Sequence, residues 1–317
     1  MNYIVLDLEW NQCPYGKEKE NPEIPFEILE IGAIKLSEEK KILGTFKETI
    51  CPVVYKQFHF RTKEILDYSM EELKQSRRFP DVTRDFFAWC GNDYILCTWG
   101  PSDLPELQRN LDFHQSENPL PKPLFYYDVQ KLFSILYDDG KLRRSLEHAV
   151  EALRIEKTNP FHRAFDDTFY TAKVMMKMNW DAVKSYRSVD YYRPPENRKE
   201  EIYMIFADYA KFVSKLYRTR EELMADRTVL ATRCYLCGKM LRRTVRWFPV
   251  GQKQYLCVAS CPRNGFLKGK IRIKKASDGR YFAIRTLKPA SEEQVAEILA
   301  RKEEIQKKNR ERRKHKS

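Results

Sequence analysis

The N-terminal stretch 3–10, with the sequence YIVLDLEW, constrains the fold more than any other part of the chain. Its aliphatic, β-branched start is typical of a buried strand, and two carboxylates stand two residues apart near its end. Side chains alternate between the two faces of a strand, so Asp7 and Glu9 point to the same side of the sheet. Neighbouring acids in a buried strand repel each other and are costly to desolvate, and a divalent cation relieves both costs. The alternative is an edge strand whose two acids face water.

Length and charge predict more than one domain. A chain of 317 residues exceeds the usual single-domain length, and a 42% hydrophobic content is enough for a sizeable core. Residues 1–180 carry 24 basic and 29 acidic side chains, whereas residues 181–317 carry 34 and 16. A strongly basic second part is expected where a protein meets a polyanion, and the alternative is a basic appendage with no specific partner. With no apolar run long enough to cross a membrane and no signal segment, the sequence predicts a cytoplasmic protein with no membrane partner.

Residues 1–182 are predicted to form a layered α/β domain. Strand-like runs at 26–36 and 42–50 complete an antiparallel meander with the N-terminal strand. A helical pattern at 81–90 leads to another buried strand at 94–99, after which helices and strands alternate.

Three further polar residues stand near the ends of predicted elements. Asp103 follows the strand that ends at Trp99 and begins a helix, which is where ligands gather in open α/β sheets. A carboxylate there is equally an ordinary helix N-terminal cap. His162 comes just before a helix whose first turn contains Asp167, with Asp166 beside it as the alternative ligand. For these residues too, loop or helix-end surface charge is the alternative.

The polar residues nevertheless follow one another in a recognisable order along the chain: Asp7, Glu9, Asp103, His162 and Asp167. The pattern Asp-x-Glu, then Asp after an apolar strand, then His-x4-Asp resembles the three motifs of the DEDDh group of DnaQ-like 3′–5′ exonucleases. Residues 27–35 are similar to the second strand of that family, and residues 99–103 are similar to its Eri-type and sporulation-inhibitor-like branches. The resemblance covers about residues 1–180 and implies a ribonuclease H-like mixed sheet flanked by helices.

The resemblance also implies a role for each residue. Asp7 would bridge two Mg²⁺ or Mn²⁺ ions, Glu9 and Asp167 would bind the first ion, and Asp103 would serve the second. His162 would be the general base that takes a proton from the attacking water. The implied activity is 3′–5′ hydrolysis of single-stranded RNA or DNA. An alternative is a nucleic-acid-binding adaptor that keeps the nuclease fold and acts through its C-terminal part.

Residues 183–230 are predicted to form a linker and a long amphipathic helix over about 199–228. Its apolar side would consist of residues at helical spacing: Ile202, Ile205, Tyr209, Phe212, Leu216 and Leu223.

Residues 231–290 are predicted to form a small β-rich domain with a structural zinc site. Four thiols in two close pairs match a tetrahedral Zn²⁺ site: Cys234, Cys237, Cys257 and Cys261. Disulfides are the alternative, but the absence of an export signal disfavours them. The module resembles a zinc ribbon, and a catalytic zinc is disfavoured because four thiolates leave no position for water.

This module is also rich in cations and aromatic residues, the combination that single-strand binding requires. Six basic residues are the candidate nucleic-acid contacts: Arg242, Arg243, Arg246, Lys270, Arg272 and Lys274. The alternative for the aromatics is packing in a thin core. Residues 291–317 are predicted to form a basic C-terminal helix and tail that begins with a capping box at Ser291.

Overall fold

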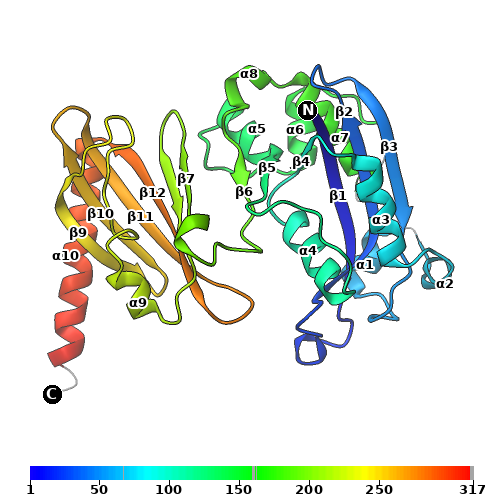
Figure 1. Ribbon diagram of the computed structural model, residues 1–317, viewed down its shortest axis with the longest axis horizontal. Coiled ribbons are helices and arrows are strands. Elements are labelled where there is room, and N and C mark those ends of the chain that lie inside the picture. The colour runs from blue at the N-terminus through cyan, green and yellow to red at the C-terminus, as the bar shows by residue number, and fades with distance from the viewer. Residues whose placement is uncertain (67, 159–160, 162, 315–317) are drawn as a thin grey trace. The chain divides into compact units, whose positions relative to one another are not determined.

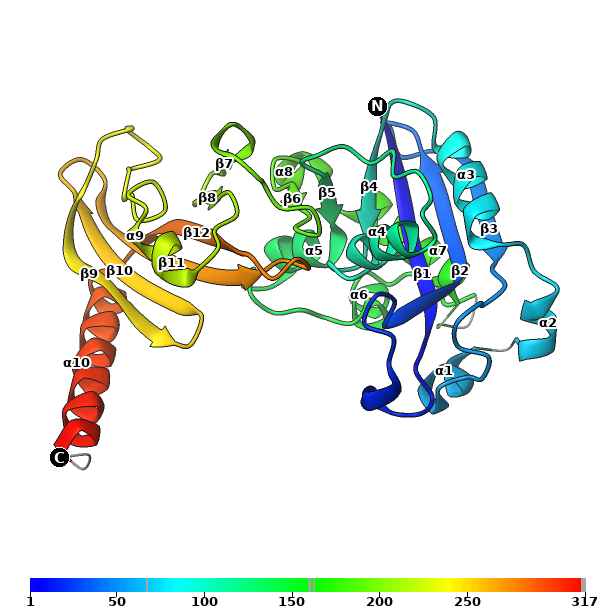
Figure 2. The same cartoon turned by 60° about the horizontal axis from the view of Figure 1, so that its bottom comes forward.

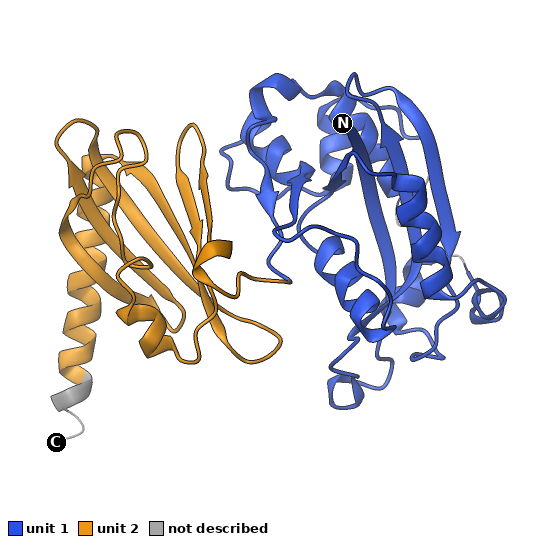
Figure 3. Ribbon diagram, in the orientation of Figure 1, with its two compact units in different colours: residues 1–192 blue, residues 193–317 orange. Residues whose placement is uncertain are grey.

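The computed structural model describes residues 1–66, 68–158, 161 and 163–314. The chain divides into two compact units, residues 1–192 (unit 1) and residues 193–317 (unit 2), which Figure 3 colours separately. Each unit contains one six-stranded sheet within its described residues.

The sheet of unit 1 is mixed, with the strand order β3-β2-β1-β4-β5-β6 (Figure 1). β1 pairs antiparallel with β2 and parallel with β4, β2 pairs antiparallel with β3, and β5 is parallel to β4 and antiparallel to β6. The strands are β1 (Asn2–Gln12), β2 (Phe26–Leu36), β3 (Ile42–Thr49), β4 (Tyr94–Thr98), β5 (Phe125–Asp128) and β6 (Ser188–Val189). The predicted three-strand meander is confirmed.

Helices cover both faces of this sheet because alternate side chains of β1 enter two different cores. Tyr3 and Val5 pack with α5, α6, α7 and α8, whereas Ile4 and Leu6 pack with α3 and α4. The helices of unit 1 are α1 (Phe60–Ile65), α2 (Met70–Lys74), α3 (Phe79–Cys90), α4 (Asp103–Phe113), α5 (Val129–Tyr137), α6 (Leu146–Ala152), α7 (Ala164–Lys177) and α8 (Trp180–Val183), with a short 3-10 turn η1 (Lys17–Lys19). The predicted mixed sheet flanked by helices is confirmed.

Unit 2 is built on an antiparallel sheet with the order β7-β8-β12-β11-β10-β9. Its elements are η2 (Arg198–Glu200), β7 (Ile202–Ile205), β8 (Ala210–Val213), α9 (Arg220–Ala225), β9 (Arg242–Gly251), β10 (Gln254–Cys261), β11 (Gly265–Lys275), β12 (Tyr281–Ala290) and α10 (Glu292–Lys314). The long helix α10 lies beside the sheet, and its last turns extend beyond the strands (Figure 2).

The two faces of this sheet are covered differently. On one face, Ile298 of α10 packs against Val245 of β9 and Val258 of β10. On the other face, Leu223 of α9 and residues of the following loop pack against Ile271 of β11 and its neighbours.

The predicted long helix over 199–228 is wrong. The structure forms β7, β8 and the six-residue α9 in this segment. Phe212 lies in a strand that pairs with β12, and Leu223 is buried from the short helix, so the apolar residues meet the sheet in two different ways. None of the helices formed by the described residues is long and apolar enough to cross a membrane.

Candidate functional site

The site begins with two half-buried acids of β1. Asp7 and Glu9 lie on the face of β1 that continues from Val5 toward α7, as the alternation of a strand requires. Across the β1–β2 ladder, Asp7 is opposite Gly32 and Glu9 is opposite Glu30. The backbone of β1 therefore aims both carboxylates at the helix that covers this face.

The first turn of α7 supplies the third acid, Asp167. This turn approaches β2 so closely that a Cβ atom on Gly32 would collide with the backbone of Ala164 and Phe165. The hydroxyl of Thr168 donates a hydrogen bond of 2.9 Å to the Gly32 carbonyl oxygen. The close contact at Gly32 places the start of α7 beside Asp7.

The carboxylates of Asp7, Glu9 and Asp167 form one group, since each offers an oxygen and these oxygens all lie within 4.8 Å of one another. Burial, with Asp167 and other nearby acids, raises the pKa of Glu9 to about 8. Burial and the charge of Asp103 also raise the pKa of Asp7 well above its ordinary value. Neighbouring acids with raised pKa values are typical of a carboxylate group that can bind a cation.

Asp103 is the first residue of α4 and is 5% exposed. Burial raises the pKa of Asp103 to about 7, an effect that hydrogen bonds from its own backbone N–H and from the Leu8 N–H reduce. The bond from Leu8 places this carboxylate beside β1, between the two acids of that strand. The N-cap residue of α4 is Ser102 rather than Asp103, and the Ser102 side chain accepts no capping hydrogen bond.

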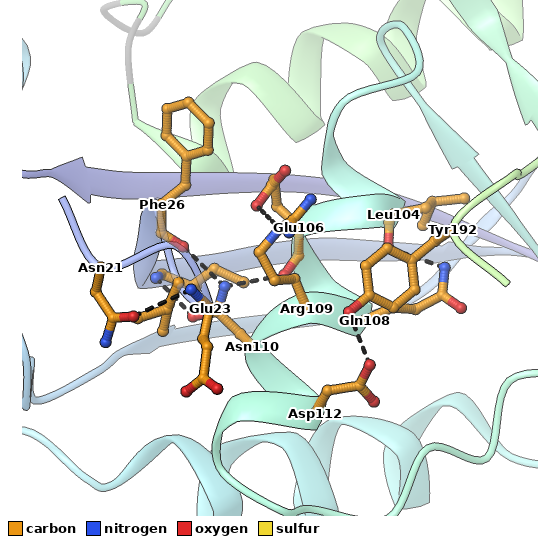
Figure 4. Close-up of polar contacts among 12 residues, drawn as sticks. Asn21, Glu23, Phe26, Leu104, Glu106, Gln108, Arg109, Asn110, Asp112 and Tyr192 are labelled. Atoms are coloured by element: carbon orange, nitrogen blue, oxygen red, sulfur yellow. Dashed lines mark hydrogen bonds and ion pairs between the residues drawn. The ribbon is translucent and has the colours of Figure 1, made fainter. Parts of the chain in front are cut away.

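Polar contacts fix α4 against β2 and so hold Asp103 in place (Figure 4). The side chain of Asn110 accepts a hydrogen bond from the Ile28 N–H at 3.1 Å and donates one to the Phe26 carbonyl oxygen at 2.8 Å. Near the end of the helix, the Tyr192 hydroxyl donates to Asp112 at 2.7 Å. The two bonds of Asn110 tie the helix to the same strand that receives α7.

Glu30 of β2 is a further acid near this site that sequence reasoning did not single out as a site residue. Its side chain is fully buried, and the backbone N–H of Ala164 lies close enough to its carboxylate to lower its pKa. Burial raises its pKa, while Lys47 and Arg163 oppose that rise. The signal that could have found it is the ladder register, which places it directly opposite Glu9.

Two sequence expectations remain at this site. His162 lies outside the described residues. Asp166 is buried in α7 and is not a member of the carboxylate group, whereas Asp167 is.

The donor set fits a hard divalent cation. Mg²⁺ and Mn²⁺ prefer carboxylate oxygens, and three such oxygens converge here from β1 and α7 with a fourth acid beside them. A ribonuclease H-like sheet with acids at β1, the start of α4 and the start of α7 defines a nuclease of the DEDDh class. The chain matches the family described as Exonuclease (RNase_T) over residues 4–175, and it belongs to this exonuclease family.

Several solved nuclease structures are similar to this chain. The nuclease domain of 3′hExo, a DEDDh family member bound to rAMP, is 19% identical with a TM-score of 0.50, over 60% of this chain and 96% of that chain. A full-length 3′-exonuclease is 19% identical with a TM-score of 0.48, over 57% and 82% of the two chains. E. coli exonuclease I in complex with an oligonucleotide is 13% identical with a TM-score of 0.46, over 81% and 54%. Among curated proteins, none matches this chain.

A second cluster of potential ligands lies in unit 2. The sulfur atoms of Cys234, Cys237 and Cys261 all lie within 4.8 Å of one another, and Cys237 Sγ is 3.6 Å from Cys261 Sγ. The structure does not bring Cys257 into this group. Cys257 precedes Cys261 by four residues on the extended strand β10, a separation of about 13 Å along the strand.

The six basic residues predicted to contact nucleic acid do not share one face of the sheet. On β11, Lys268 donates to Gln294 of α10 at 2.7 Å, and the alternation of the strand puts Lys270, Arg272 and Lys274 on this same face. We call these three residues the β11 basic row. In contrast, Arg243 donates to the Leu230 carbonyl oxygen in the loop that covers the opposite face. Arg242 and Arg246 are exposed on β9.

Proposed function

We propose that this protein is a metal-dependent 3′–5′ exonuclease that hydrolyses single-stranded nucleic acid. The observation that carries the proposal is the convergence of Asp7, Glu9 and Asp167, with buried Asp103 beside them, on a chain of the exonuclease family. Four acids at one place are costly to the fold and have no structural use there, whereas phosphodiester hydrolysis requires them.

The carboxylates would hold two Mg²⁺ or Mn²⁺ ions. When bound, such a pair stabilises the charge on the attacking and leaving oxygens of a phosphodiester. Asp7 would contact both ions, since it is the acid whose pKa is raised by each of Asp103, Glu9 and Asp167. Glu9 and Asp167 would complete one ion's ligands, and Asp103 would lie on the side of the other.

His162 is assigned as the general base through the family motif alone. An imidazole titrates near neutral pH, so it can accept the proton of an attacking water and later release it. Its place five residues before Asp167 in the chain would keep it near the carboxylate group.

The preference for a single-stranded 3′ end rests on the family and on one structural neighbour. The nuclease domain of 3′hExo is bound to rAMP, a mononucleotide of the kind that stepwise hydrolysis releases. Unit 2 would add affinity for the strand through its basic residues.

The test uses oligonucleotides labelled at the 5′ end, as RNA and as DNA, incubated with the full-length protein. We expect mononucleotide release and a ladder of shortening 5′-labelled strands with Mg²⁺ or Mn²⁺, and no release with EDTA. Asp7→Asn and His162→Ala should each reduce kcat by at least about 100-fold while circular dichroism stays unchanged. Glu18→Gln, an exposed acid of η1, is the matched control and should keep full activity.

The alternative function is a nucleic-acid-binding adaptor that works through unit 2. It is favoured if the purified protein binds single strands but releases no nucleotide with either metal. Retained hydrolysis in Asp7→Asn would instead remove the assigned metal site.

A further inference from the structure

We propose that unit 2 holds a zinc ion through the thiolates of Cys234, Cys237 and Cys261 and the side-chain amide of Asn264, with Cys257 outside the coordination shell.

Two turns of the same form meet at this site. The first is Cys234-Tyr-Leu-Cys237-Gly238 and the second is Cys261-Pro-Arg-Asn264-Gly265. Gly238 has a φ of 72° and Gly265 has a φ of 73°, both in the left-handed region that favours glycine. Asn264 therefore occupies the position in the second turn that Cys237 occupies in the first. The sequence pairs Cys-x-x-Cys-Gly with Cys-x-x-Asn-Gly.

The side chain of Asn264 faces the sulfur atoms. Its amide nitrogen lies 3.3 Å from Cys234 Sγ and 3.6 Å from Cys261 Sγ. Amide oxygen and nitrogen exchange places by a half-turn of the terminal group, so the oxygen can take the same position. Asn264 thus presents either an N–H group to the sulfurs or an oxygen to a cation between them.

The distances fit the edges of a coordination tetrahedron. Zn–S bonds of about 2.3 Å at tetrahedral angles put two sulfurs about 3.8 Å apart, and Zn–O bonds of about 2.0 Å put sulfur and oxygen about 3.5 Å apart. The observed sulfur–sulfur distance between Cys237 and Cys261 is 3.6 Å, and the two amide–sulfur distances are 3.3 and 3.6 Å. A disulfide would need sulfurs about 2.0 Å apart. The arrangement is that of four ligands around one ion.

Cys257 is used in packing. It is fully buried in β10, opposite Gly269 of β11, and a Cβ atom on Gly269 would lie 2.5 Å from its sulfur and 2.7 Å from the ring of Trp247. The glycine leaves room for this sulfur and the indole in the interior of the sheet. Because Cys257 is about 13 Å from Cys261 along the strand, it cannot share an ion with it.

The proposed ligand set has a chemical consequence. Three thiolates give the Zn²⁺ site a net charge of −1, and the amide oxygen is a weaker donor than a fourth thiolate. Binding releases the protons of the three thiols, so affinity increases with pH. The bond to Asn264 is then the weakest of the four, and a stronger ligand at position 264 should tighten the site.

The test is a titration of the metal-free, reduced full-length protein with Zn²⁺ against a competing chelator, and with Co²⁺ to follow sulfur-to-metal charge-transfer absorption. We expect one thiolate-bound ion per chain, counted from the charge-transfer absorption, to which ions on the carboxylates of unit 1 do not contribute. Asn264→Cys and Asn264→Asp should bind Zn²⁺ at least as tightly as the wild type because both supply an anionic ligand. Asn264→Leu, of similar size and without a donor, should bind at least about ten-fold more weakly.

The aspartate variant separates coordination from hydrogen bonding, because a carboxylate can bind the ion but cannot donate to a thiolate. Weak binding in Asn264→Asp together with Asn264→Leu would overturn the proposal. Cys261→Ala should lose the ion, and Cys257→Ala should keep it with an unchanged Co²⁺ spectrum. Loss of the ion from Cys257→Ala that folds like the wild type by circular dichroism would also overturn it. If Cys257→Ala does not fold, the order of affinities among the Asn264 variants decides.

Discussion

The acids of unit 1 show, at the scale of single residues, what a convergent group of carboxylates does to a fold. The pKa of Glu9 is raised to about 8 and that of Asp103 to about 7. Burial is the main cause in both, and the charge of Asp167 adds to it. In the metal-free protein the folded state therefore keeps protons that the unfolded chain releases. A bound cation would displace those protons, so protons and metal compete for the same carboxylate oxygens.

From this competition we predict that the metal-free protein loses stability as pH increases. Because the folded state raises the pKa values of Asp7, Glu9 and Asp103, these protonated acids stabilise it fully below the ordinary carboxyl pKa values of 3.8 to 4.5. That stabilisation is lost as pH rises to about 8. In EDTA, the melting temperature should be lower at pH 8 than at pH 5.5. Adding Mg²⁺ should raise it more at pH 8, where the acids are ionised.

Asp7→Asn should reduce both the loss of stability with increasing pH and the gain on adding Mg²⁺, because it removes one of the mutually repelling charges. Without metal at pH 8 it should be more stable than the wild type by about 1–2 kcal/mol, or roughly 2–8 °C, and it should not respond to Mg²⁺. Glu18→Gln should behave as the wild type. A wild-type melting temperature in EDTA that increases from pH 5.5 to pH 8 would contradict this account.

At the scale of elements, the site depends on how closely α7 approaches β2. That approach is possible because Gly32 has no Cβ, and it places Asp167 beside Asp7. The positions of the Asp7 and Asp167 carboxylates therefore depend on the contact between β2 and α7.

Gly32→Ala is therefore predicted to damage the metal site from a distance. The added methyl group must push the first turn of α7 away from the sheet, at a cost of about 1–3 kcal/mol. Affinity for Mn²⁺ should fall by about ten-fold or more, as when a supporting residue of a metal site is lost. Calorimetric titration and thermal unfolding measure the two effects. Gly44→Ala in β3 is the matched control, since its methyl group would meet only the Trp89 side chain at 3.5 Å. Equal Mn²⁺ affinity in both variants would show that the approach of α7 does not set the site.

The elements also show where sequence reasoning succeeds and where it stops. The alternation in β1 was readable because Asp7 and Glu9 break an otherwise apolar run, and the family motifs placed Asp103 and Asp167 near it. The helical spacing of Ile202 to Leu223 was misleading, because these residues do not share one buried face: Ile202 is buried in β7, whereas Ile205 is exposed. The sequence prediction paired Cys261 with Cys257 because it considered only cysteines. It therefore missed Asn264, whose side chain lies beside Cys234.

At the scale of the whole molecule, the two units have opposite charge. Unit 1 contains 26 basic and 31 acidic residues, whereas unit 2 contains 32 and 14. A carboxylate site needs acids that repel a polyanion, so positive charge for binding the strand has to be supplied elsewhere. The β11 basic row concentrates part of that charge on the face of the sheet that carries α10. Burial, and then the positive charges of Arg272 and Arg301, lower the pKa of Lys270.

We therefore predict that binding and hydrolysis can be changed separately. Replacing Lys270, Arg272 and Lys274 together by Gln should weaken binding of a single strand by about ten-fold at moderate salt. It should also reduce the slope of log affinity against log salt by about 2, or 0.7 for each lost phosphate contact. The kcat with saturating substrate should stay unchanged, because the carboxylate group belongs to unit 1.

Matched single variants test whether the face of the sheet matters. Arg272→Gln and Arg243→Gln remove the same charge from opposite faces, so a strand that follows the basic row should lose affinity in the first variant and little in the second. Asp7→Asn should show the reverse of the triple variant, with near-normal binding in EDTA and no hydrolysis. If both single variants weaken binding equally and the triple variant keeps the wild-type salt slope, unit 2 attracts nucleic acid only through its net charge and the β11 basic row is not a binding surface.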